Sequence, residues 1–152
     1  LFPGTRDFSS FLAVPAAIAY LNAWENDGMN SQKYCHMRVV EAADKLRSEW
    51  NSEYPSCGPC GAVEDTSLIA TQAMVRLPEE LIVNDVPGQV GKGVRDVLRD
   101  EYHIEAAIGN FGPARGNFVR LSWGVYNHVE DIQRLSMAVL EIVAKQKTKL
   151  KF

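Results

Sequence analysis

The residue best suited to bind a ligand is an arginine inside an apolar strand. Arg120 stands in the middle of the segment FVRLS, residues 118–122. Its planar guanidinium can hold a carboxylate through two parallel hydrogen bonds. Burying that charge without a carboxylate partner is costly, so a buried Arg120 requires an internal acid or a bound substrate carboxylate. Alternation along the strand places Phe118, Arg120 and Ser122 on one face, and that face can equally be exposed to water.

Two cysteines form the second motif with possible chemistry. Cys57 and Cys60 are separated by a Gly-Pro dipeptide. A structural zinc site needs two further ligands at suitable spacing, and Cys35 with His36 is far upstream on an expected helix. A redox pair usually opens a helix after a strand, whereas this pair lies in a turn. We therefore expect a structural or incidental role and keep a small zinc-binding or redox-active domain as the weaker alternative.

Histidine-based hydrolysis is not indicated by the sequence. His36, His103 and His128 are scattered, with no nucleophile or second ligand at useful spacing. We expect these three residues to be surface or capping residues. The sequence also lacks a P-loop, a dinucleotide-binding glycine motif and a His-Glu-x-x-His zinc motif.

The composition indicates one ordinary globular domain. The 152 residues are 46% hydrophobic and 23% charged, with a formal net charge of −3. This weakly acidic balance offers no surface for neutralising phosphates, so we expect no nucleic-acid partner. No apolar stretch is long enough for a membrane span, and we expect no membrane partner. Three cysteines, an odd number, disfavour a secreted disulfide framework, and we expect a cytoplasmic location.

The hydrophobic periodicity predicts four helices and three strands that would position Arg120. The helices are expected at Ser9–Ala23, Ser31–Trp50, Gly91–Glu101 and Asn127–Lys147, and the strands at Thr71–Leu77, Ile104–Ile108 and Phe118–Ser122. Runs of helices and strands that do not alternate regularly indicate an α+β class, with a small and mainly antiparallel sheet and helices packed on one face.

Three features refine this prediction. Pro15 lies deep in the first helix and is expected to kink or divide it. The second helix should bury a stripe through Val39, and the last helix a stripe that starts at Val129. Asn127 and Glu130 have the spacing of an N-cap and its third helical residue, which predicts a variant of the capping box.

Two groups of motifs resemble the class V aminotransferase-like enzymes, which depend on pyridoxal 5'-phosphate (PLP). The octapeptide RLSWGVYN at residues 120–127, followed by VEDI at 129–132, is similar to the closing motif of these enzymes. The tetrapeptide GTRD at residues 4–7, followed by FLAVPAA at 11–17, resembles the segment that joins the large domain to the small one. Within that group the similarity is to the isopenicillin N epimerase-like and cysteine desulfhydrase-like branch.

The resemblance implies an organisation and a set of roles. Residues 1–24 would be the connecting helix from a large domain, and residues 25–152 the C-terminal small domain. Arg120 would bind the α-carboxylate of an amino-acid substrate. Thr5, with Gly4 beside it, would contact the phosphate of PLP across the interface of a homodimer.

Two departures from the family pattern limit what this chain can do alone. In the family, the lysine that carries PLP and the residues around the pyridine ring belong to the large domain, so this segment is expected to be inactive without that domain. The first residues, LFPGT, read as though an upstream part had been removed. The loop at residues 109–117 also lacks the catalytic cysteine of cysteine desulfurases. Epimerase, C–S lyase (desulfhydrase) or aminotransferase-like chemistry remains, and the alternative is a self-standing, non-catalytic α+β interaction module.

Overall fold

The computed structural model describes residues 9–52, 66, 69–83, 93–110 and 116–149. In chain order its elements are α1 Ser9–Ala23, β1 Glu25–Asn26, β2 Met29–Asn30, α2 Ser31–Trp50, β3 Gln72–Arg76, α3 Val94–Tyr102, β4 Ala107–Asn110, β5 Asn117–Ser122 and α4 Val129–Lys149. The predicted α+β class is confirmed. No helix within the described ranges is long and apolar enough to cross a membrane, and the cytoplasmic location stays a prediction.

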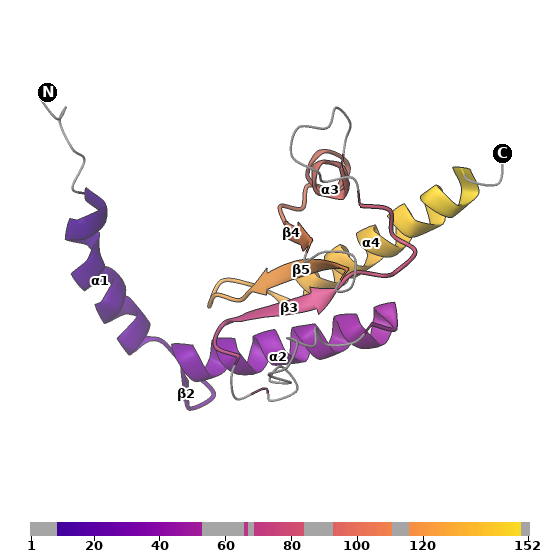
Figure 1. The fold of residues 1–152 in the computed structure, drawn as a ribbon. Helices are drawn as coiled ribbons and strands as arrows, with labels where there is room; N and C mark the ends of the chain where they lie inside the picture. The colour runs from indigo at the N-terminus through magenta and orange to yellow at the C-terminus, as the bar shows by residue number, and fades with distance from the viewer. Residues whose placement is uncertain (1–8, 53–65, 67–68, 84–92, 111–115, 150–152) are drawn as a thin grey trace, which may run out of the picture.

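A three-stranded antiparallel sheet forms the centre of the molecule, with β5 between β3 and β4. Val75 pairs with Val119 and Ala73 with Leu121, so these apolar side chains share one face of the sheet. All four are buried in one cluster with apolar residues of α2 and α4. Figure 1 shows α2 running alongside β3 and β5, with α4 on the same side of the sheet.

The helical stripes that build this core agree with the sequence prediction, apart from one residue. The buried residues of α2 are Ser31, Cys35, Val39, Ala42, Ala43, Leu46 and Trp50. In α4 the buried residues are Ile132, Leu135, Ser136, Ala138, Val139, Ile142 and Val143. Val129 was expected to be buried but is 41% exposed, because it is the first residue of α4 and lies at the rim of the core.

A short hairpin that the sequence analysis missed joins α1 to α2. Strands β1 and β2 pair through a two-residue turn in which Asp27 has φ 50° and Gly28 has φ 74°. Positive φ at both positions is the geometry of a type I′ turn, and Asp-Gly is one of its preferred sequences. The sequence prediction recognised a break here but no strands, since each strand has only two residues.

Helix α1 lies apart from the rest of the molecule, as Figure 1 shows. All fifteen of its residues are classed as exposed, and none carries a charge. Its exposed large side chains are Phe11, Leu12, Val14, Ile18, Tyr20 and Leu21. A helix that is apolar all round is normally enclosed by other protein, so the described residues leave a surface that needs covering. Pro15 lies within α1 and does not divide it into two elements.

The start of β4 differs from the prediction by three residues. The sequence predicted a strand at 104–108, whereas β4 covers Ala107–Asn110. The residues before it end α3: His103 adopts the left-handed conformation (φ 57°), and the Ile104 N–H donates to the Leu98 carbonyl over 2.9 Å. The backbone of Ile104 is therefore used to close the helix and cannot begin the strand.

The N-terminal cap of α4 also differs from the prediction. Asp131, rather than Glu130, accepts a hydrogen bond from a backbone N–H before the helix, that of His128, over 3.0 Å. Asn127 instead closes the turn before the helix, because its side-chain oxygen accepts from the Gly124 N–H over 2.8 Å. The capping box prediction was thus displaced by one residue, since the turn at 124–127 delays the start of the helix.

These contacts predict unequal effects for two neighbouring acids in the first turn of α4. Asp131→Ala should lower the free energy of unfolding by about 1 kcal/mol, because the His128 N–H loses its acceptor. Glu130→Ala removes the same charge from the helix N-terminus without that bond and should cost about half as much or less. Urea unfolding of both variants measures the difference. A larger loss for Glu130→Ala would support the cap predicted from the sequence.

Candidate functional site

The pairing of the central strand places Arg120 on the sheet face opposite the core. Arg120 is directly opposite Met74 on β3 and Ala107 on β4. The side chains of directly opposite residues lie on the same face, and Val119 and Leu121 on either side of Arg120 point into the core. We call the surface formed by Gln72, Met74, Ala107, Arg120 and Ser122 the open face. Four of these residues are exposed and Met74 is half-buried.

Arg120 is not part of an internal ion pair in the described part of the chain. The ion pairs of the described arginines involve Arg38, Arg47, Arg76, Arg95 and Arg99. Arg120 is exposed, and no described carboxylate is paired with it. It is therefore not a buried charge that the fold must neutralise with an internal acid. Its guanidinium can therefore bind an external anion without first breaking an ion pair with a described acid.

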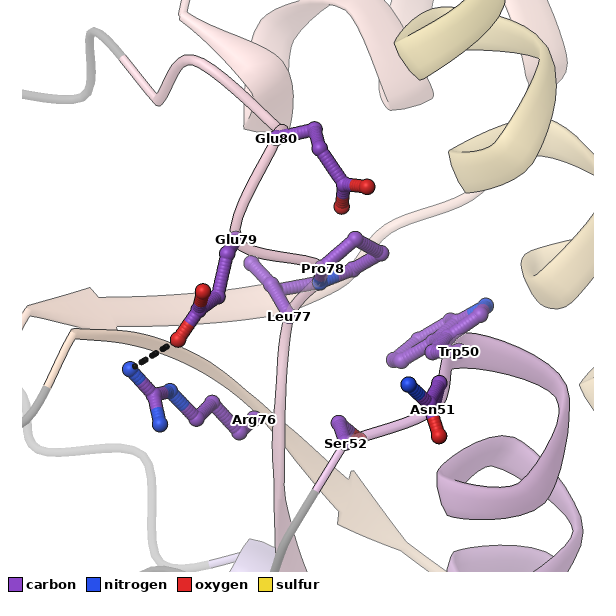
Figure 2. Close-up of a pocket in the computed structure, with 8 residues that line it drawn as sticks. All are labelled: Trp50, Asn51, Ser52, Arg76, Leu77, Pro78, Glu79 and Glu80. Carbon is purple, nitrogen blue, oxygen red and sulfur yellow. Dashed lines mark ion pairs between the residues drawn. The ribbon is translucent and has the colours of Figure 1, made fainter.

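A second arginine on β3 has a different environment. Arg76 is on the same side of the sheet, opposite Phe118, which is only 2% exposed. Its guanidinium pairs with Glu79 over 3.1 Å, as Figure 2 shows. It also lies against Gly116, where an added Cβ would come within 3.2 Å of Arg76 Nε and where φ is 78°. Arg76, the last residue of β3, is thus paired with Glu79 and packed against Gly116.

A cavity of about 440 Å³ lies beside Arg76. It is lined by Trp50, Asn51, Ser52, Arg76, Leu77, Pro78, Glu79 and Glu80 (Figure 2). Its charges are largely satisfied internally, because Glu79 pairs with Arg76 and Glu80 is 3.4 Å from Lys147. The cavity does not include Arg120, so the open face and this cavity are separate surfaces.

His103 and His128 have the surface and capping positions expected from the sequence, whereas His36 does not. His103 caps the C-terminus of α3, and the backbone of His128 is bound by Asp131 at the start of α4. His36 has a further role that the sequence did not reveal: its Nδ1 lies 2.7 Å from the Ile69 carbonyl and ties α2 to the segment before β3. No group of three or more potential ligands among the described residues is arranged to hold a metal ion.

Four candidate functional residues named from the sequence lie outside the described residues. These are Gly4 and Thr5, predicted to contact PLP, and the cysteine pair Cys57 and Cys60. Their predicted roles stay predictions. The remaining cysteine, Cys35, is buried in the core, and this burial raises the pKa of its thiol, which makes it a poor nucleophile.

The described lysines lie on α2 and α4. Lys45 pairs with Glu49 over 2.6 Å on α2, and Lys145 pairs with Glu141 over 2.9 Å on α4. The hydrogen bond that Lys145 donates to the Glu141 carboxylate raises the pKa of Lys145, which keeps the amine protonated. None of these lysines is on β3, β4 or β5, the strands that carry the open face. The described lysines and the open face are therefore on different elements.

Gln72 and Ser122 are residues of the open face to which the sequence analysis gave no role. They are directly opposite each other and next to the pair of Met74 and Arg120. Alternation along β5 linked Ser122 to Arg120, but nothing linked Gln72 to either residue. That link requires the cross-strand register, which a single sequence does not supply.

Comparison with known proteins finds relatives that share one activity in their names. No protein-family model matches the chain. The chain is 33% identical over 147 residues to a protein of Arabidopsis thaliana named "Probable L-cysteine desulfhydrase, chloroplastic", covering 92% of this chain and 29% of that protein. It is 27% identical over 158 residues to an L-cysteine desulfhydrase of the same plant, covering 95% of this chain and 33% of that protein. The chain thus spans about a third of the length of these relatives.

The position of Arg120 predicts that its removal leaves the fold intact. Arg120→Ala should change the free energy of unfolding by less than about 0.5 kcal/mol, because the side chain that is removed is exposed and is not paired with a described acid. Leu121→Ala, one position along the same strand, should cost about 2–5 kcal/mol because it leaves a cavity in the core. Denaturant unfolding of the two variants measures both effects. A loss above about 1.5 kcal/mol for Arg120→Ala would identify Arg120 as a structural residue.

Proposed function

We propose that this chain is the substrate-carboxylate-binding domain of a larger PLP-dependent C–S lyase of the L-cysteine desulfhydrase type. The observation that carries the proposal is the position of Arg120: it stands on the central strand of the sheet, exposed, with no described acid paired to it. The similarity to two plant L-cysteine desulfhydrases over more than 90% of the chain supports the type of enzyme.

Arg120 would act by fixing the α-carboxylate of the amino acid. Two parallel N–H donors hold both carboxylate oxygens, so the orientation of the bonds at the α-carbon is set relative to the sheet. The positive charge also keeps the carboxylate ionised and bound throughout the reaction. Cysteine desulfhydrases depend on PLP in general, and PLP supplies an electron sink for the α-carbon when it is bound.

The remaining parts of the active site would come from a large domain of the same protein and from a second subunit. In this proposal Thr5 and Gly4 contact the PLP phosphate across a homodimer interface, and the lysine that carries PLP belongs to the large domain. The exposed helix α1 supports a covering partner, because fifteen residues without a charge form a poor water-facing surface. The same helix argues against a self-standing interaction module.

The reaction type is proposed as elimination, on the basis of the relatives' names, and not as epimerisation or transamination. The class V aminotransferase-like group, including its epimerase branch, contains all three chemistries, so the products of the full-length protein decide between them. Release of sulfide from L-cysteine would support the lyase. A change of configuration without sulfide release would indicate an epimerase, and accumulation of a keto acid with loss of the amino group to the cofactor would indicate an aminotransferase.

Substitution of Arg120 in the full-length enzyme should lower activity without affecting the cofactor. A hydrogen bond to a charged group contributes about 1.5–3 kcal/mol, so Arg120→Ala should reduce kcat/KM by about ten- to a hundredfold. Arg120→Lys keeps the charge but loses the two-pronged geometry, and it should recover only part of the activity. PLP content, measured by absorbance after dialysis, should equal that of the unchanged enzyme.

Arg134, an exposed arginine on α4, provides the matched control. Arg134→Ala removes the same charge away from the sheet and should leave kcat/KM within about twofold. Equal losses in the Arg120 and Arg134 variants would show a general charge effect. Normal kinetics in Arg120→Ala would contradict the proposed function.

The 152-residue chain by itself should not retain PLP, because the lysine that carries the cofactor is expected in the large domain. After incubation with PLP and dialysis, the chain should show no visible absorption band and no label fixed by borohydride. A band that survives dialysis and is fixed by borohydride at one lysine would contradict this organisation of the enzyme.

A further inference from the structure

We infer that Gln72 is a second carboxylate-binding residue, which together with Ser122 completes the site around Arg120 for a ligand with a single carboxylate. The inference rests on the proposed function and adds residues to the same site. Gln72 is the first residue of β3, a strand that neither the sequence motifs nor the comparisons connect with substrate binding.

The strand register brings the three side chains together. Gln72 is directly opposite Ser122, and the neighbouring pair on this face is Met74 with Arg120. Directly opposite residues have Cβ atoms about 4.5–5.5 Å apart, and diagonal neighbours such as Gln72 and Arg120 are about 7–8 Å apart. A glutamine and an arginine side chain both span such a gap, so a carboxylate held by Arg120 lies within reach of the Gln72 amide.

The chemistry of the two neutral side chains fits a shared anion. Gln72 carries an NH₂ group with two donors, and Ser122 carries a hydroxyl that rotates to donate. Both residues are exposed, and the structure gives neither side chain a hydrogen-bond partner among the described residues. A carboxylate has about four acceptor sites, of which a guanidinium fills two, so donors from Gln72 and Ser122 can fill the others.

The surroundings of Arg120 favour a ligand with one negative charge. The other diagonal neighbour on β3 is Arg76, whose guanidinium lies against Gly116 and is paired with Glu79. Met74 and Ala107, which flank Arg120 directly, are uncharged. The open face thus presents one available cation with neutral donors beside it, which suits a monocarboxylate better than a ligand with two adjacent acids.

The test uses the 152-residue chain and two matched small probes. Propionate and its neutral amide, propionamide, are titrated at constant ionic strength, and binding is followed by ¹H–¹⁵N NMR. Signals of β3 and β5 report on the open face, and unchanged signals elsewhere show that each variant is folded. The variants are Gln72→Leu, Gln72→Glu and Arg120→Ala, with Gln133→Glu on the exposed side of α4 as the matched control.

The expected result is a graded loss of propionate binding. The unchanged chain should show saturable shifts in β3 and β5 with propionate and none with propionamide. Gln72→Leu should weaken propionate binding by about three- to tenfold, because one hydrogen bond from a neutral and solvent-exposed donor is lost. Gln72→Glu should remove binding as fully as Arg120→Ala does, because the new carboxylate pairs with Arg120. Gln133→Glu should leave binding unchanged.

Failure of this inference can be distinguished from failure of the proposed function. If Arg120→Ala abolishes binding while Gln72→Leu and Gln72→Glu bind propionate normally, Gln72 is not part of the site and the inference is overturned alone. If propionate binding is the same in Arg120→Ala as in the unchanged chain, or propionamide produces the same shifts as propionate, the carboxylate site itself is refuted. Equal losses in Gln72→Glu and Gln133→Glu would also overturn the inference, because they would reflect net charge only.

Discussion

The pairing register of the central strand β5 is the constraint on which the rest of the structure depends. Successive side chains of a strand point to opposite faces, so a register that buries Val119 and Leu121 against α2 and α4 must turn Arg120 away from the core. A slip of one residue would place the guanidinium among apolar side chains and expose two core residues. The buried cluster therefore fixes the orientation of Arg120 as firmly as it fixes the fold.

Much of this arrangement can be predicted from the sequence, because long helices carry a strong periodic signal. The bounds predicted for α2 agree with the structure, and the stripe through Val39 is buried. Short elements carry weaker signals. The β1–β2 hairpin has two residues in each strand, and the start of β4 is delayed because Ile104 caps α3. The candidate site was predictable only in part, since the sequence identified Arg120 but could not give the cross-strand neighbour Gln72.

The exposure of Arg120 could not be decided from the sequence for a physical reason. Both faces of β5 contain apolar residues. Phe118 is on the same face as Arg120 and is nevertheless buried. Alternation alone therefore does not say which face is covered by helices. That answer comes from α2 and α4, which bury the opposite set of residues and leave Arg120 with Ser122 and Gln72 at the exposed end of the sheet.

A larger protein would explain why two surfaces, the open face and the apolar helix α1, are exposed among the described residues. The chain spans about a third of the length of its plant relatives, and in the proposed enzyme a large domain covers both surfaces. The sheet then supplies the carboxylate-binding group, and the large domain supplies the cofactor. In this arrangement the sheet needs no lysine, and the described lysines are all on helices away from it. The arrangement also explains why no described acid is paired with Arg120.

The most direct test is a structure of the full-length protein with an amino-acid substrate analogue bound. The account predicts that the guanidinium of Arg120 lies within hydrogen-bonding distance of both oxygens of the analogue's α-carboxylate, at an interface between the open face and the large domain. An Arg120 that is instead paired with an aspartate or glutamate of the protein, while the analogue's carboxylate binds elsewhere, would contradict it.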